Sequence, residues 1–295
     1  MFSSKNWDNK HIFCIFAGQM RLSIKTHNQL LDLSSPKVMA IVNITPDSFY
    51  TSWGNLNTQQ LLTHTQSIID AGADIIDIGA CSTRPGSTPI EATEEWKRLE
   101  PALKAIRSHF PQVVISVDTF RAKIAEQAIH IGADIINDVF GGSADDRIWE
   151  VVAQHQVPYI LTHAQPLLGS CNAQPNQLMS QMLDFFQDKL DHLHKKGIAD
   201  VILDPGFGFA KTVQDNYEIL RQLEILSLPN TAVLVGISRK SMLYKPLGLT
   251  AEDVLPATIA ANTIALEHGA RILRVHDVSA AKQAIAIYSL THQTK

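Results

Sequence analysis

The stretch VILDPGFGFAK, residues 201–211, decides how the rest of the chain is interpreted. Three apolar residues lead directly into Asp204, and a Pro-Gly-x-Gly loop follows. Such a short apolar run predicts a strand buried on both faces, as in a parallel sheet. In a barrel of such strands the loops after the strands bind ligands, so an acidic residue here indicates a site. Asp204 could instead cap the turn or the next helix, and repetition along the chain decides between the two.

The same arrangement recurs from residue 37 onward. The other strand-like runs are residues 38–43, 74–79, 113–118, 134–139, 158–163, 232–238 and 271–277. The runs with helical spacing of apolar residues are 61–69, 94–110, 124–131, 148–154, 178–193, 217–226 and 254–266. Three glycine-containing returns, at Ala71, Ile131 and Lys196, predict a helix end followed by a strand. Alternating strands and helices of this number predict an α/β fold, a (β/α)8 TIM barrel over residues 37–295.

An open doubly wound sheet is the alternative architecture, and it is disfavoured because no GxGxxG follows the first strand. Residues 1–36 lack the repeating pattern and form an N-terminal extension. Two β-like pieces, residues 12–16 and 20–24, predict a short hairpin over one end of the barrel.

Composition narrows the possible partners. The 295 residues carry a net charge of −4, so we expect no nucleic-acid surface. Cys14, Cys81 and Cys171 are few and lack metal-ligand spacing, which argues against a zinc site and for a reducing compartment. The apolar run HIFCIFAG is too short to cross a bilayer, so we expect no membrane partner and a cytoplasmic protein.

Polar residues gather where the predicted strands end, and in a barrel these positions face one mouth. Singly, each has an ordinary alternative as a cap or a surface ion pair. Asp118, Asn137, Asp204 and Lys240 are donors and acceptors suited to the edge of a nitrogen-rich heterocycle. A second group suits a phosphate-like anion, directly or through a metal: Arg84, Arg274 and His276, with Asn43 nearby. Together they predict a heterocycle that carries a phosphate leaving group.

A longer set of motifs carries a family resemblance. These are VMAIVNITPDSF (38–49), ADIIDIGACSTRPGS (73–87), ISVDTF (115–120), ADIINDV (133–139), ILDPGFGF (202–209), LVGISRKS (234–241) and RVHDV (274–278). In this order they resemble the signatures of the dihydropteroate synthase family, from Leu31 onward. The resemblance implies condensation of 7,8-dihydropterin-6-ylmethyl diphosphate with p-aminobenzoate in folate biosynthesis, with Mg²⁺ as cofactor and a homodimeric enzyme.

The resemblance also implies roles for single residues. It makes Asp118, Lys240, Arg274 and His276 the catalytic group. The pterin ring would contact Asp118, Asn137, Asp204, Lys240 and the backbone of Gly236; Mg²⁺ would bind Asn43. The diphosphate would contact Thr83, Arg84, Arg274 and His276. The p-aminobenzoate site would include Phe49, Pro85, Phe209 and Ser241, although Ser241 has an alternative role as a helix N-cap.

Four positions depart from the family pattern. Thr51 and Cys81 stand where the family has acidic residues, Thr162 where it has Met, and Ala210 where it has a loop glycine. These departures leave two alternatives open: a pterin-binding paralogue with weak or no condensation activity, and a pterin-dependent methyltransferase. The latter has no evident use for Lys240 and Ser241.

Overall fold

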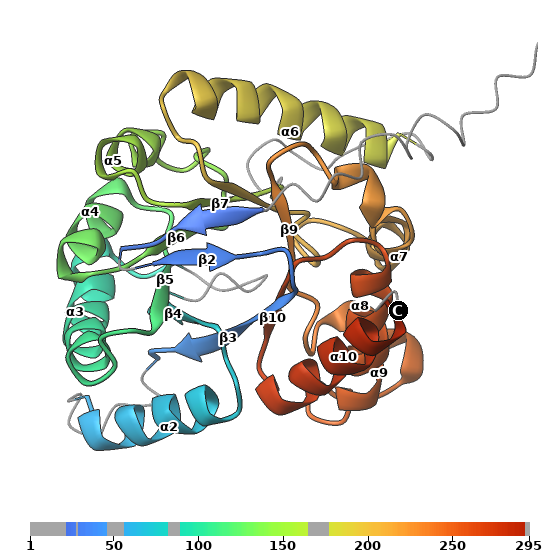
Figure 1. Cartoon of the computed structure of the whole chain (residues 1–295), viewed down its shortest axis with the longest axis horizontal. Coiled ribbons are helices and arrows are strands. Elements are labelled where there is room, and N and C mark those ends of the chain that lie inside the picture. The colour runs from blue at the N-terminus through green and yellow to red at the C-terminus, as the bar shows by residue number, and fades with distance from the viewer. Residues whose placement is uncertain (1–21, 28, 46–55, 82–88, 165–176, 293–295) are drawn as a thin grey trace, which may run out of the picture.

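Eight parallel strands close into a barrel in the computed structural model, which describes residues 22–27, 29–45, 56–81, 89–164 and 177–292 (Figure 1). The strands run in chain order around the barrel and β10 pairs with β3, which confirms the predicted architecture. They are β3 Lys37–Asn43, β4 Ile75–Gly79, β5 Val114–Asp118, β6 Ile135–Asp138, β7 Tyr159–Thr162, β8 Val201–Asp204, β9 Ala232–Val235 and β10 Ile272–Val275.

Helices surround the barrel (Figure 1). Their buried apolar side chains form one core with the outward-facing apolar side chains of the strands. They are α2 Thr58–Asp70, α3 Ala92–His109, α4 Ala122–Ile131, α5 Ile148–His155, α6 Leu178–Lys195, α7 Val213–Arg221, α9 Leu255–Glu267 and α10 Val278–Thr291. A short helix, α8 Ser241–Leu247, occupies the loop after β9. Among the described residues, no helix combines the length and apolar character needed to cross a membrane.

Two local expectations change. The predicted helix 217–226 is two elements, α7 and a 3-10 helix at Leu223–Leu226. α7 begins earlier than apolar spacing suggested, because Thr212 and Asp215 form a capping box that is entirely polar. The alternative role of Ser241 as an N-cap is wrong, since Ser241 is the first helical residue and Lys240 occupies the cap position.

The three glycine returns are confirmed, and the acidic residue after each has a structural task. Gly132, for example, ends α4 in the left-handed conformation at φ 111°. The acidic residues accept backbone N–H groups at the N-terminal end of the barrel: Asp74 from Val38 at 2.8 Å and Asp134 from Ile115 at 2.8 Å. These carboxylates therefore satisfy strand ends that would otherwise lack partners.

The N-terminal extension contains the predicted hairpin with a different partner strand. β1 Ser23–Lys25 pairs antiparallel with β2 Leu30–Asp32, a segment not assigned to a strand from the sequence; residues 12–16 lie outside the described residues. Ile24 and Leu33 pack against the strand residues that fill the N-terminal end of the barrel interior, closing that end. The Asp200 carboxylate accepts the Lys25 N–H at 2.8 Å and fastens the hairpin there.

Side-chain alternation divides the barrel interior into an apolar and a polar layer. The apolar layer contains Met39, Ile75, Val114, Ile135, Ile160, Ile202, Leu234 and Ile272. Two residues further along each strand the chain again points inward, and this layer is mostly polar: Asp77, Ser116, Asn137, Thr162, Asp204 and Arg274, with Ile41 and Gly236. The polar layer forms the floor of the C-terminal mouth.

Candidate active site

An arginine held between two carboxylates lies at the floor of the mouth. Arg274 Nε donates to Asp77 Oδ2 at 2.6 Å, and Arg274 Nη2 donates to Asp118 Oδ2 at 2.8 Å. Both carboxylates are buried, Asp77 at 1% and Asp118 at 7% exposure. Charge-assisted bonds of this length fix the guanidinium in one orientation. The arrangement leaves Nη1 as the edge of Arg274 that neither carboxylate uses.

Burial dominates the ionisation of this group. It raises the pKa of Asp118 to about 7, because desolvation outweighs the favourable charge of Arg274, and the Asp77 carboxylate adds to the rise. For Arg274 burial is again the largest single effect and acts to lower the pKa. The charges of Asp77 and Asp118 together outweigh it, so the pKa of Arg274 is raised. At neutral pH Arg274 is therefore always charged, whereas the pKa of the Asp118 carboxyl lies close to the surrounding pH.

The amide of Asn137 extends the floor network to β6. Asn137 Nδ2 donates to Asp77 Oδ2 at 3.1 Å, so one carboxylate oxygen receives bonds from both Asn137 and Arg274. Several buried polar atoms of the polar layer and of Asp118, two residues further along β5, have no hydrogen-bond partner within the described part of the chain: Asp77 Oδ1, Ser116 Oγ, Asp118 Oδ1, Asn137 Oδ1 and Thr162 Oγ1. Buried polar atoms are rarely left unsatisfied in a folded protein, so this cluster indicates a place for a polar ligand or water.

Lys240 and Asp204 form the second charged group of the mouth. The Nζ of Lys240 donates to the Phe207 carbonyl and lies 4.8 Å from the centre of the Phe209 ring. Burial lowers the pKa of Lys240 to about 8, against the Asp204 charge, which acts to raise it. Burial likewise raises the pKa of Asp204, although Lys240 and the Gly206 N–H act to lower it. Sequence analysis placed both residues at the mouth, and in the structure the charge of each acts on the pKa of the other.

The loop after β8 is held in shape by its own residues. Lys211 Nζ donates to the carbonyls of His163 at 2.8 Å and Gly206 at 3.0 Å. Gly206 has φ 68°, and a Cβ there would lie 2.3 Å from the His163 carbonyl oxygen, so only glycine fits. Ala210, which replaces the family's glycine, also has a positive φ of 49°. The loop that carries Phe209 is therefore rigid and locally strained.

The remaining described candidates line the rim. Ser238 Oγ accepts the backbone N–H of His276 at 3.3 Å and lies 3.1 Å from the ring Nδ1 of the same residue, which is exposed. A Cβ on Gly236 would meet Arg274 only at 3.9 Å, so the protein's own packing does not demand a glycine. Asn43 ends β3 and is half-buried. Ser241 follows Lys240 at the start of α8.

Some predicted residues cannot be placed. Phe49, Thr51, Thr83, Arg84 and Pro85 lie outside the described residues. Cys81, the last described residue before the second loop, is buried, and burial raises the pKa of its thiol. Cys81 therefore does not supply the negative charge of the family's glutamate.

Asp77 is the residue that sequence analysis missed. It lies in the middle of β4 rather than at its end, where polar residues had been sought. Its signal is present in IIDIG, residues 75–79, because a carboxylate inside a fully buried strand needs a partner. A search for charged residues within strands would have found it.

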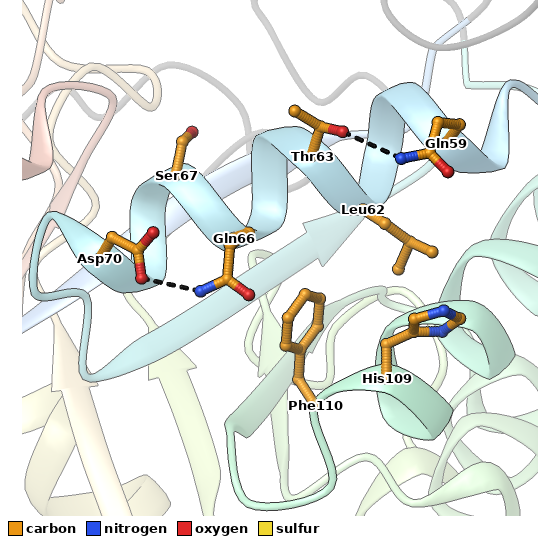
Figure 2. A pocket seen from close by; sticks show the side chains of 8 residues that line it. All are labelled: Gln59, Leu62, Thr63, Gln66, Ser67, Asp70, His109 and Phe110. Carbon is orange, nitrogen blue, oxygen red and sulfur yellow. Dashed lines mark hydrogen bonds between the residues drawn. The ribbon is translucent and has the colours of Figure 1, made fainter.

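A separate hollow lies on the outer surface between α2 and the end of α3, and it has a volume of about 600 Å³ (Figure 2). Four of its polar lining residues bond one another: Gln59 bonds Thr63 at 3.4 Å and Gln66 bonds Asp70 at 2.7 Å. None of the predicted site residues lines it. The mouth therefore remains the candidate site.

The chain is similar to known proteins over most of its length. Residues 39–276 match the family model of pterin binding enzymes. The dihydropteroate synthase of Streptococcus pyogenes is 37% identical over 85% of this chain and 94% of the relative. The Xanthomonas albilineans dihydropteroate synthase, solved with 4-aminobenzoic acid, is 31% identical at a TM-score of 0.85, covering 93% of this chain and 100% of that one. The same bacterial enzyme was solved with 7,8-dihydropteroate (28% identity, TM-score 0.82, 92% and 100% coverage). The chain therefore belongs to the dihydropteroate synthase family of pterin-binding transferases, which serve folate biosynthesis.

Proposed function

We propose that the mouth of this barrel condenses 7,8-dihydropterin-6-ylmethyl diphosphate with p-aminobenzoate to give dihydropteroate and diphosphate. The observation that carries the proposal is the buried polar floor, in which Asp77, Asp118, Asn137 and Arg274 form one network beside Asp204 and Lys240. Small-molecule complexes of the Xanthomonas relatives contain 4-aminobenzoic acid or 7,8-dihydropteroate. The proposal requires one site that binds both a pterin and p-aminobenzoate.

The pterin ring is assigned to the floor. Asn137 Oδ1 and Asp118 Oδ1 are buried acceptors with no partner in the described residues, and they suit N–H donors of the ring. Asp204 supplies a further acceptor, and Lys240 a donor for the ring's oxygen side. Gly236 leaves the space above Arg274 free of a side chain, which suits a flat ring.

Electrostatic stabilisation is the main catalytic task in this proposal. Loss of diphosphate from the ring-attached methylene gives a cation delocalised into the pterin, so we propose a dissociative displacement. The Asp118 carboxylate stabilises that developing charge in its ionised form, and preorganised charges act strongly in a buried site. The arylamine nitrogen then attacks the methylene carbon, and its proton leaves to water or to diphosphate. No strong general base is needed.

The leaving diphosphate is assigned to Arg274, through its Nη1 edge, and to His276, Thr83 and Arg84. Mg²⁺ is assigned to the amide oxygen of Asn43. Among the described residues no three His, Cys, Asp or Glu side chains converge on a common point. Mg²⁺ is commonly held by one or two side chains together with substrate phosphates, so a single half-buried Asn fits an ion that enters with the diphosphate. Its chemistry there would be to neutralise charge on the departing oxygens.

The second substrate is assigned to the rim. Phe209 and Ser241, with Phe49 and Pro85 of the other two loops, would contact p-aminobenzoate. Lys240 Nζ lies 4.8 Å from the centre of the Phe209 ring, which supports a role for this cation next to both assigned substrate sites. Catalysis would thus depend on Lys240 more than binding of p-aminobenzoate does.

A product assay tests the proposal. Protein, Mg²⁺, dihydropterin diphosphate and p-aminobenzoate should release diphosphate, and Lys240→Ala should abolish most of that release without loss of fold. A Thr51→Asp variant measured beside it reports whether the loop departure limits turnover. If the wild type and the Thr51→Asp variant both bind pterin diphosphate but form no product, the non-catalytic paralogue is the better description. Methyl transfer to a corrinoid would instead identify a methyltransferase.

We also propose a cytoplasmic homodimer. Support for the dimer is an apolar outer surface on α9 and α10, where Ile264, Ile287 and Leu290 are 45%, 61% and 64% exposed. Leu290→Lys should convert a dimer to a monomer in light scattering, whereas Leu30→Lys, at the equally exposed hairpin, should not. A monomeric wild type would contradict the proposal. The few cysteines support the compartment.

A further inference from the structure

Asp77 is a buried charge that the proposed chemistry leaves without a direct role. It lies in β4, and its Oδ2 receives Nε of Arg274 from β10 and Nδ2 of Asn137 from β6. Each of those strands is two positions away from β4 in the barrel, on opposite sides. A single oxygen therefore ties together residues from both sides of the floor.

The first consequence concerns the orientation of the Asn137 amide. An ionised carboxylate only accepts hydrogen bonds, so it must face the nitrogen of the amide and never the oxygen. Asn137 Oδ1 is then turned away from Asp77, and it is buried without a partner in the described residues. Without the Asp77 charge, the amide would be free to present either its donor or its acceptor.

The second consequence passes through Arg274 to Asp118. With Nε on Asp77, the guanidinium presents Nη2 to Asp118 Oδ2 at 2.8 Å. This engages one oxygen of Asp118 and leaves Oδ1 buried and without a partner in the described residues. Two acceptors, one on Asn137 and one on Asp118, are thus set by the same carboxylate.

We propose that Asp77 is a positioning residue that fixes the hydrogen-bond pattern of the ring site, turning Asn137 Oδ1 and Asp118 Oδ1 into acceptors for two N–H donors of the bound heterocycle. The inference rests on the proposed function for the identity of that heterocycle. In this inference Asp77 acts through its two neighbours, Asn137 and Arg274.

Calorimetric binding of dihydropterin diphosphate to four proteins tests the inference: wild type, Asp77→Asn, Asn137→Ala and the double variant. Asp77→Asn should weaken binding roughly tenfold, as expected for a lost bond to a charged group. Since Asp77 acts partly through Asn137, the double variant should bind more tightly than the product of the two single effects predicts. Fully independent effects would overturn the inference.

Asp134→Asn is the matched control. Asp134 is also buried, also bonds an arginine at 2.6 Å, and lies at the opposite end of the barrel. Asp134→Asn should lower Tm but leave the pterin Kd unchanged. If Asp77→Asn does not fold, Asp77→Ser, which leaves room for a water, replaces it in the cycle. A wild type that binds no pterin diphosphate would reject the proposed function, whereas a wild type and an Asp77→Asn variant of equal affinity would reject only this inference.

The pH profile separates positioning from a general loss of packing. The charged groups that act on Asp118 are Arg274, Asp77, Glu95, Asp138 and Lys240. Asp77 raises the pKa of Asp118, whereas Arg274, which Asp77 holds in place, lowers it more strongly. If Asp77→Asn releases Arg274 from Asp118, the acid limb of pterin binding should therefore move to higher pH. Asp134→Asn should keep the wild-type limb. A limb at lower pH in Asp77→Asn would show that Arg274 stays on Asp118 without Asp77, and it would contradict the inference.

Discussion

Aspartates at the two ends of the barrel are used in opposite ways. At the N-terminal end, Asp134 accepts the backbone N–H groups of Ile115 at 2.8 Å and His27 at 2.9 Å, and it pairs with Arg107 at 2.6 Å. At the mouth, Asp77 and Asp118 share one arginine, and each has an oxygen without a partner in the described residues. The residue type is the same, and only the supply of donors differs.

The difference shows that the N-terminal end of the barrel is stabilised by its carboxylates, whereas the mouth is destabilised by them. Carboxylates that accept backbone N–H groups join strands, helices and the hairpin at the N-terminal end. Buried acceptors without donors destabilise the mouth until a ligand supplies the donors. Barrels of this type generally use the N-terminal end for stability and the C-terminal end for the active site. Here the hydrogen-bond partners of individual aspartates show the same difference.

The largest expected effect is that of Arg274→Met at the mouth. Removing the cation leaves two buried carboxylates without compensation, which should lower the free energy of unfolding by about 3–5 kcal/mol. Turnover should be lost as well. The loss of stability should be smaller at acidic than at alkaline pH, since protonation neutralises the carboxylates. Urea unfolding at several pH values measures it.

Arg107→Met is the control for that variant. Arg107 bonds Asp134 at 2.6 Å, yet Asp134 keeps its backbone donors when the arginine is removed. We expect a clearly smaller loss of stability than for Arg274→Met and no change in KM. Equal losses at the two ends would show that the backbone donors do not matter, and the comparison would fail.

The hairpin gives the next effect. Ile24 is 3% exposed and packs into the apolar layer at the N-terminal end, so Ile24→Ala should cost about 2–5 kcal/mol. Pterin affinity and KM should stay at wild-type values. Leu30→Ala, at 70% exposure in the same hairpin, should change stability little. A raised KM in Ile24→Ala would mean that the two ends are coupled.

The pH dependence of Tm in an Asp118→Asn variant tests whether the buried carboxylate destabilises the mouth. Because the pKa of Asp118 rises from 3.8 to about 7 on folding, the native state binds this proton more tightly than the unfolded state. This residue therefore lowers stability as pH rises from about 4 to about 7. Asp118→Asn removes that loss, so its Tm should match wild type near pH 4 and exceed it by a few degrees at pH 7, at roughly 2–4 °C per kcal/mol. A lower Tm at pH 7 would contradict the assignment.

Much of this organisation can be predicted from the sequence, because strand alternation and helical spacing are local properties. All eight barrel strands lie at the predicted positions, and the charge of Asp204 acts on the pKa of Lys240. The same reasoning missed β2 at Leu30–Asp32, since a three-residue strand with two exposed side chains has no apolar pattern.

The floor network could not be predicted from residue order. The bond between Asp77 and Arg274 joins residues 197 positions apart, and it depends on the inward direction of both side chains in a closed barrel. Sequence analysis placed Arg274 at the mouth, and the resemblance implied a contact with the diphosphate. The structure ties two of its three nitrogens to carboxylates below the rim, and that placement follows only from barrel closure.

The smallest effect concerns the backbone of the mouth. Ala210 has φ 49° in the loop that carries Phe209, and a left-handed conformation costs a non-glycine residue roughly 1–2 kcal/mol. Glycine removes that cost but gains flexibility in the unfolded chain, worth roughly 0.4–1 kcal/mol. Ala210→Gly should therefore stabilise by about 1 kcal/mol or less in urea unfolding. Asn230, at φ 60° in the loop before β9, tolerates this conformation, so Asn230→Gly should gain less. If Ala210→Gly gains nothing, the strain at the mouth lies in its buried charges alone and not in its backbone.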